Sequence, residues 1–134
     1  MNDDEQRTLI DDVVTLPEMQ RLRHQLTRLA RQAGLPDDRA EAFVIAVHEA
    51  VINAIRHAGG RGEVAVVQDD QRRLIAEVSD AGPGTPCSVT LTMPPPTAHG
   101  GRGLPLAGEL ADGIEVHSDR HGTTVRLEMY LPPS

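Results

Sequence analysis

The chain has 134 residues and is 39% hydrophobic, which predicts one domain over residues 1–134 with a single core. Its net charge of −7 makes nucleic acid and anionic membranes poor direct partners, and no apolar run approaches the ~20 residues of a membrane-spanning helix. Cys87 is the only cysteine and the N-terminus is acidic, so we expect a cytoplasmic protein without an intramolecular disulfide or a signal peptide.

The first two predicted elements are a strand and an amphipathic helix. Residues 8–14, TLIDDVV, favour a short strand. In residues 16–34, leucines recur at helical spacing, Pro17 suits the helix start and Gly34 suits the position just past the end. We therefore expect this helix to bury one face and to end at the glycine.

The second predicted helix lies within residues 35–60. Asp37 or Asp38 is expected to cap its start, and Gly59–Gly60 to end it. Apolar residues occur on more than one side of this helix, which indicates that it packs against neighbours on several sides.

The second half of the chain is predicted to be mostly strands. Residues 62–70 and 72–80 favour two strands joined by a polar turn. Residues 81–103 are rich in Gly and Pro, and a loop of this length is typical of a lid, a binding loop or a disordered segment. A short helix over 104–112 and a hairpin over 113–132 complete the chain.

This order of elements predicts the fold class. One strand, two helices, two strands, a long loop, a helix and two strands favour an α+β two-layer sandwich. Its sheet is expected to be mixed but mainly antiparallel, with the helices on one face. Phe43 and Tyr130 are the only aromatic residues, so the core must consist of Val, Leu, Ile and Ala, and a base-stacking platform is not expected.

A polar stripe runs along the second helix. Glu49, Asn53 and His57 follow one another at four-residue intervals, so their side chains are neighbours on the helix surface. A carboxylate and an amide oxygen suit Mg²⁺ or a bound water, and a glutamate can take a proton from a hydroxyl. On this stretch alone, a solvated glutamate and a histidine favoured by the helix dipole are the better interpretation.

Two glycine-containing segments border predicted strands. Asp80 ends a strand and is followed by Gly82 and Gly84. A carboxylate there can accept a hydrogen bond from a ligand amino group while the glycines allow close approach, although an ordinary loop exit is the simpler interpretation. Near the C-terminus, a turn glycine precedes Thr123 and Thr124, whose hydroxyls are expected to point to opposite faces of the sheet.

A third glycine-containing segment leads into the short helix. Gly101, Arg102 and Gly103 precede Leu104, where the helical pattern begins. Free N–H groups and the positive end of a helix dipole favour an anion, typically a phosphate, at such a position. A flexible hinge before an uncapped helix is the alternative.

The order of these four signals resembles a known ATPase fold. The segments HEAVIN, SDAGPG, GRGLPLAGELAD and GTTVRL occur in this order within about residues 17–131. The arrangement resembles the Bergerat ATP-binding fold shared by gyrase, heat-shock chaperones, histidine kinases and mismatch-repair proteins. Within that superfamily, the chain looks most like the bacterial anti-sigma factor serine/threonine kinases of the RsbW-like branch.

The resemblance implies a role for each matching residue. ATP would lie between the helical layer and the sheet, with Asn53 as the Mg²⁺ ligand and Glu49 as the general base. Asp80 would bind the adenine amino group, helped by a water and Thr123, and residues 85–100 would form the lid over ATP. The remaining nucleotide-binding residues would be Gly82, Gly84, Gly101, Arg102, Gly103 and Leu104.

The resemblance also implies an activity and partners. A kinase of this branch binds a sigma factor and keeps it from RNA polymerase. It also uses ATP and Mg²⁺ to phosphorylate a small antagonist protein of the STAS type. The resemblance further implies a homodimer. The alternative is a nucleotide-binding regulatory switch without catalysis. A histidine kinase fragment with His24 as phosphoacceptor is disfavoured. A phosphoacceptor histidine normally lies in its own dimerising helical hairpin, and here only one helix precedes the helix that carries Glu49.

Overall fold

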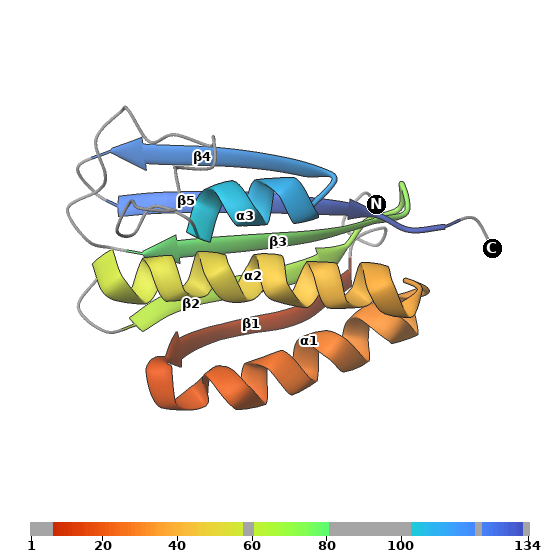
Figure 1. The fold of residues 1–134 in the computed structure, drawn as a ribbon, viewed down its shortest axis with the longest axis horizontal. Helices are drawn as coiled ribbons and strands as arrows, with labels where there is room; N and C mark the ends of the chain where they lie inside the picture. The colour runs from red at the N-terminus through yellow and green to blue at the C-terminus, as the bar shows by residue number, and fades with distance from the viewer. Residues whose placement is uncertain (1–6, 58–60, 81–102, 120–121, 133–134) are drawn as a thin grey trace.

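The computed structural model describes residues 7–57, 61–80, 103–119 and 122–132. They form two layers, with a five-stranded sheet covered on one face by helices (Figure 1). This arrangement confirms the predicted α+β sandwich. The elements are β1 (Arg7–Thr15), a 3₁₀ turn (Leu16–Glu18), α1 (Met19–Ala33), α2 (Asp37–His57), β2 (Arg61–Gln68), β3 (Arg73–Asp80), α3 (Gly103–Leu110), β4 (Gly113–Asp119) and β5 (Gly122–Tyr130).

The strand order in the sheet is β1-β2-β3-β5-β4. Every strand pairing that the structure describes is antiparallel, so in this part of the chain the sheet is more regular than the mixed one expected. Since β5 lies between β3 and β4, the chain must pass over β5 after leaving β3, and α3 lies on the helical face along this crossover (Figure 1).

The boundaries of the first two helices follow local hydrogen bonding. The Glu18 carboxylate accepts 2.9 Å hydrogen bonds from the Thr15 backbone N–H and hydroxyl, which lower the pKa of Glu18. Gly34 ends α1 with φ of 111°, as expected for a glycine in the left-handed region. α2 begins earlier than predicted, because the Pro36 carbonyl accepts the first helical bond from Ala40 at 2.7 Å.

Asp37 and Asp38 therefore lie in the first turn of α2, where their charge favours the helix dipole, and not at its cap. The predicted stop at Gly59–Gly60 lies outside the described residues.

α2 is the central element of the core. It contacts α1 and α3 on either side and β2, β3 and β5 beneath, which confirms the prediction of packing on several sides. The face toward the sheet is almost fully buried, and its members are 0–2% exposed: Phe43, Val47, Ala50 and Ala54. The sheet supplies alternating aliphatic residues such as Val64, Val66, Val78 and Leu127 to the same core.

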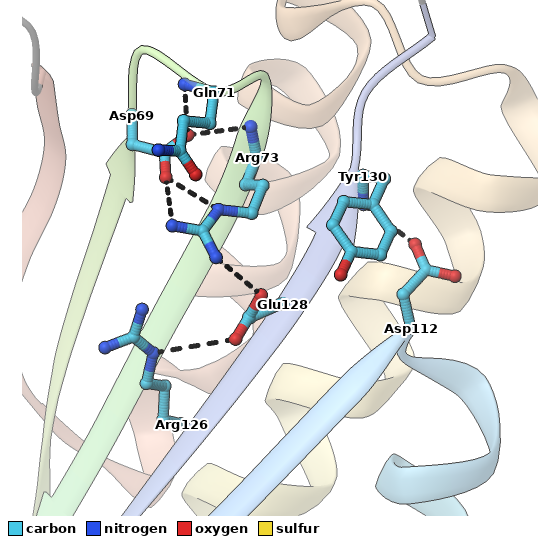
Figure 2. Close-up of polar contacts among 7 residues, drawn as sticks. All are labelled: Asp69, Gln71, Arg73, Asp112, Arg126, Glu128 and Tyr130. Atoms are coloured by element: carbon cyan, nitrogen blue, oxygen red, sulfur yellow. Dashed lines mark hydrogen bonds and ion pairs between the residues drawn. The ribbon is translucent and has the colours of Figure 1, made fainter.

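A network of charged side chains holds the end of the sheet at the β2–β3 turn (Figure 2). The Asp69 carboxylate accepts hydrogen bonds from the backbone N–H groups of Gln71 and Arg73, at 3.0 and 2.9 Å, and from Arg73 Nε at 2.7 Å. Arg73 also pairs with Glu128 at 3.1 Å, and Glu128 approaches Arg126 Nε at 3.9 Å. Burial alone would raise the pKa of Asp69, but the hydrogen bonds from Arg73 and Gln71 outweigh it, so the pKa is lowered.

Asp112 connects three elements at the same end. Its carboxylate pairs with Arg39 in the first turn of α2, and it accepts a 2.7 Å hydrogen bond from the Tyr130 backbone N–H at the end of β5 (Figure 2). The Asp112 backbone N–H donates in turn to the Glu128 carbonyl at 2.9 Å. The connection between α3 and β4 is thereby fastened to both layers.

Candidate nucleotide site

The polar stripe of α2 lies on one flank of the helix, away from α1. Val44 and His48 line a groove shared with α1, and at 100° per residue Asn53 lies about 180° around the helix from Val44. Glu49 and Asn53 are both half-buried and lie on the flank toward α3. The His57 side chain lies outside the described residues, although its backbone ends α2.

Asp80 and Thr123 meet at the end of the sheet. They are register partners on β3 and β5, and directly opposed residues of antiparallel strands project to the same face. That face is the one under the helices, because Val78 and Val125, two residues along each strand, are buried in the core. Thr123 is itself only 3% exposed, which is unusual for a polar residue.

The two adjacent threonines differ in environment, as the sequence predicts. Thr123 is buried on the helical face, whereas Thr124 is half-buried and belongs to the opposite face of the sheet. Thr123 and Asp80 both make polar or electrostatic interactions in this structure. A buried hydroxyl beside a carboxylate is a suitable place for a ligand that offers hydrogen-bond donors.

The fold brings segments from distant parts of the sequence to one end of the molecule. The C-terminal half of α2, the end of β3, the start of α3 and the start of β5 all lie at the left of Figure 1. This end therefore collects Glu49, Asn53, Asp80, Gly103 and Thr123, and we call it the site end. Gly82, Gly84, Gly101 and Arg102 lie outside the described residues, as does the Leu104 side chain.

The oxygen ligands at the site end suit a metal that shares its coordination with a substrate. Among the described residues, no group of three or more His, Cys, Asp or Glu side chains could hold a metal ion alone. Mg²⁺ is commonly held by one or two protein oxygens together with substrate phosphates. Glu49 and Asn53 fit that pattern better than they fit a metal site built only from protein.

The groove between α1 and α2 is a separate feature on the other flank of α2. His48 Nδ1 is buried there without a hydrogen-bond partner in the described part of the chain. Burial lowers the pKa of His48, and the nearby Arg23 adds to this, while Glu49 opposes it. His24 also lines this groove, so it lies on the other flank of α2 from Glu49 and Asn53.

Comparison with known proteins shows which family the chain belongs to. The family model described as the histidine kinase-like ATPase domain matches residues 14–129. The chain belongs to this family. The match spans all the elements that form the site end, from α2 to β5.

The relatives of this chain show to which branch of the family it is similar. The chain is 32% identical over 127 residues to the serine-protein kinase RsbW of Bacillus velezensis, and the match covers 82% of this chain and 76% of that protein. The serine-protein kinase RsbW of Bacillus pumilus is 33% identical over 129 residues with the same coverage. The chain is therefore an RsbW-like member of the family, as the order of its four motifs indicated.

Solved structures confirm the fold of this ATPase domain. The RsbU and RsbW domains of a Mycobacterium tuberculosis protein superpose with a TM-score of 0.65 at 21% identity, covering 93% of this chain and 34% of that one. This chain thus spans about a third of that structure. The mycobacterial sensor histidine kinase MprB has a TM-score of 0.59 at 18% identity, covering 92% of this chain and 100% of that one. Among the described residues, no helix is long and apolar enough to cross a membrane.

Proposed function

We propose that this ATPase domain is an ATP-dependent serine/threonine protein kinase that also acts as an anti-sigma factor. It would hold a sigma factor and phosphorylate a STAS-type antagonist of that complex on Ser or Thr. The observation that carries the nucleotide part of the proposal is the Asp80–Thr123 pair, which lies on the helical face of the sheet at the same end as Glu49 and Asn53. The named serine kinases among its relatives support the phosphotransfer part.

Each residue of the site end has a separate task in this proposal. Asp80 accepts a hydrogen bond from the adenine amino group, and the buried Thr123 hydroxyl supports the same edge of the base. Asn53 would hold Mg²⁺, and the N–H groups at the start of α3, beginning at Gly103, would bind the phosphates. When bound, Mg²⁺ neutralises charge on the phosphate oxygens during transfer.

Glu49 acts on the protein substrate in this mechanism. It lies one helical turn before Asn53 on the same flank of α2, so it would lie near the phosphates of a bound nucleotide. Its carboxylate would orient the attacking Ser or Thr hydroxyl and take its proton as that oxygen bonds to the γ-phosphorus, while the bond from the γ-phosphorus to the bridging oxygen breaks and ADP leaves. The half-buried position of Glu49 reduces competition from water for that hydroxyl.

The nucleotide half is tested by calorimetric titration with ATP, with and without Mg²⁺. The wild-type chain should bind ATP, and Asp80→Asn should weaken binding by roughly 10- to 100-fold, because it removes a charge-assisted hydrogen bond. Asp70→Asn, at an exposed turn residue on the opposite end, is the matched control. Absence of ATP binding by the wild-type chain would refute the proposed function.

The kinase half is tested with labelled ATP, Mg²⁺ and candidate STAS-type antagonists. Transfer of label to Ser or Thr of an antagonist is expected, and it should disappear in Glu49→Gln while ATP still binds. ATP binding without transfer to any antagonist would favour the regulatory switch over the kinase. Sigma-factor capture is then measured in parallel, with ATP and with ADP.

A further inference from the structure

α2 and the sheet approach closely where Ala54 lies over Gly62. A methyl group added to Gly62 would lie 3.0 Å from the Ala54 methyl, which is shorter than the 3.4–4 Å of ordinary contact. Both residues are buried, with Ala54 only 2% exposed. The φ angle of Gly62 is not in the left-handed region, so the space above the residue, and not its backbone conformation, requires a glycine.

The Ala54 methyl cannot move out of the way on its own. It is attached directly to the helix backbone and has no rotamer to change, so extra volume at Gly62 must displace α2 from β2. Gly108 and Gly113 have more room above them than Gly62 has. A methyl at Gly108 would meet the Ile114 Cγ2 methyl at 3.2 Å, and one at Gly113 would meet only Glu128, at 3.9 Å, so both contacts are longer than the one at Gly62.

This contact lies between the two halves of the site end. Asn53 directly precedes Ala54 on the helix, while the backbone oxygen of Ser79, the residue before Asp80, is 3.9 Å from the added methyl position at Gly62. The spacing between α2 and the sheet at Gly62 therefore helps to set the spacing between Asn53, the proposed metal ligand, and the Asp80–Thr123 pair, the proposed base-binding side.

We infer that Gly62 is a positioning residue for the nucleotide site. By carrying no side chain, it lets α2 lie close enough to the sheet for Asn53 and the Asp80–Thr123 pair to engage one nucleotide at the same time. The inference rests on the proposed function, because it concerns the geometry of that same site. It assigns the residue no contact with ATP.

The test is Gly62→Ala, with Gly113→Ala as the control for a glycine-to-alanine change in a strand. ATP affinity is measured by calorimetry with and without Mg²⁺, and the ratio of the two affinities is the readout. A misplacement of 1 Å can cost on the order of 100-fold, so a shift of a few tenths of an ångström should reduce the Mg²⁺ ratio by about threefold to tenfold. Binding without Mg²⁺ should change by less than about twofold in both variants.

A second variant moves the methyl group from helix to strand. Ala54→Gly combined with Gly62→Ala keeps one methyl in the contact, so it should restore the Mg²⁺ ratio to that of Ala54→Gly alone. This double variant also decides the matter if Gly62→Ala does not fold. A merely destabilising effect would leave the ratio unchanged, because both affinities refer to folded protein.

Two results would overturn the inference while leaving the proposed function intact. One is a folded Gly62→Ala protein with the wild-type Mg²⁺ ratio, and the other is a folded double variant in which the ratio stays low. Failure of the wild-type chain to bind ATP at all is a different result, and it refutes the proposed function itself.

Discussion

The two ends of the sandwich use polar residues in opposite ways. At the site end, carboxylate, amide and hydroxyl groups come from different elements and lie beside small residues. At the other end, which we call the turn end, charged side chains bind one another and the backbone at 2.7–3.1 Å. The turn end consists of Arg39, Asp69, Arg73, Asp112 and Glu128.

Under the proposed function, stability and activity depend on residues in different parts of the molecule. Of the ion pairs at the turn end, Arg39–Asp112 connects α2 to the α3–β4 connection, whereas Asp69–Arg73 and Arg73–Glu128 connect segments of the sheet. At the site end, α2 and the sheet instead approach each other closely where Ala54 lies over Gly62. Substitutions at the two ends should therefore separate loss of activity from loss of stability.

The largest expected effect is that of Glu49→Gln on phosphoryl transfer. Removing a general base lowers transfer by roughly 10²- to 10⁴-fold, while the free energy of unfolding should change by less than about 0.5 kcal/mol. Transfer of label from ATP and urea unfolding measure the two quantities. Glu41→Gln, at an exposed glutamate on the same helix, should leave both unchanged. Wild-type transfer rates in Glu49→Gln would contradict the assigned role.

Asp69→Asn should have the opposite profile, with lower stability and intact ATP binding. The carboxylate is 7% exposed and accepts several hydrogen bonds, so we expect a loss of about 2 kcal/mol at pH 7. Because the folded-state pKa is lowered, this stabilisation is present above the unfolded pKa of ~3.9 and is lost as the pH falls through the folded pKa. Urea unfolding from pH 7 to pH 3 measures it.

The stability difference between wild type and Asp69→Asn should thus close at acid pH. Asp70→Asn, at the exposed neighbour, should match the wild type throughout. A difference that persists undiminished at pH 3 would show that the lost charge is not its cause.

Asp112→Ala should destabilise less, by about 1–2 kcal/mol, because its partner Arg39 is partly exposed. The change removes the acceptor of Arg39 and of the Tyr130 N–H, and so loosens the α3–β4 connection. Urea unfolding gives the loss, and ATP titration should stay within about twofold of the wild type if the two ends are independent. Glu109→Ala, at an exposed residue of α3, is the control. A large loss of ATP affinity would mean that the two ends are coupled.

The smallest effect is expected at His48, which belongs to neither end. Because the folded-state pKa of His48 is lowered, its contribution to the free energy of unfolding is fully present above the unfolded pKa of ~6.5. That contribution falls as the pH drops below this value. His48→Gln should remove this small slope between pH 7.5 and pH 5.5 in urea unfolding. His24→Gln, at an exposed histidine in the same groove, should keep it. An unchanged slope in His48→Gln would assign the pH dependence to other groups.

Local patterns in the sequence were sufficient for most elements. Leucine spacing and Gly34 located α1, and apolar runs bounded by turn residues located β3 and β5, because each signal depends on residues close together in the chain. The N-terminus of α2 was misplaced, since Asp37 and Asp38 suit a first turn about as well as a cap. Charge alone could not predict that Asp112 would join Arg39 and Tyr130.

The sequence by itself determined the order of elements, the burial of α2 on several sides and the motif order that indicates an ATPase. Only the tertiary structure decided that Asp80 lies opposite Thr123 on the helical face, because strand register depends on pairing between distant segments. It also decided that Gly62 lies under Ala54. The spacing between layers results from packing across the whole core, so no local pattern in the sequence reports it.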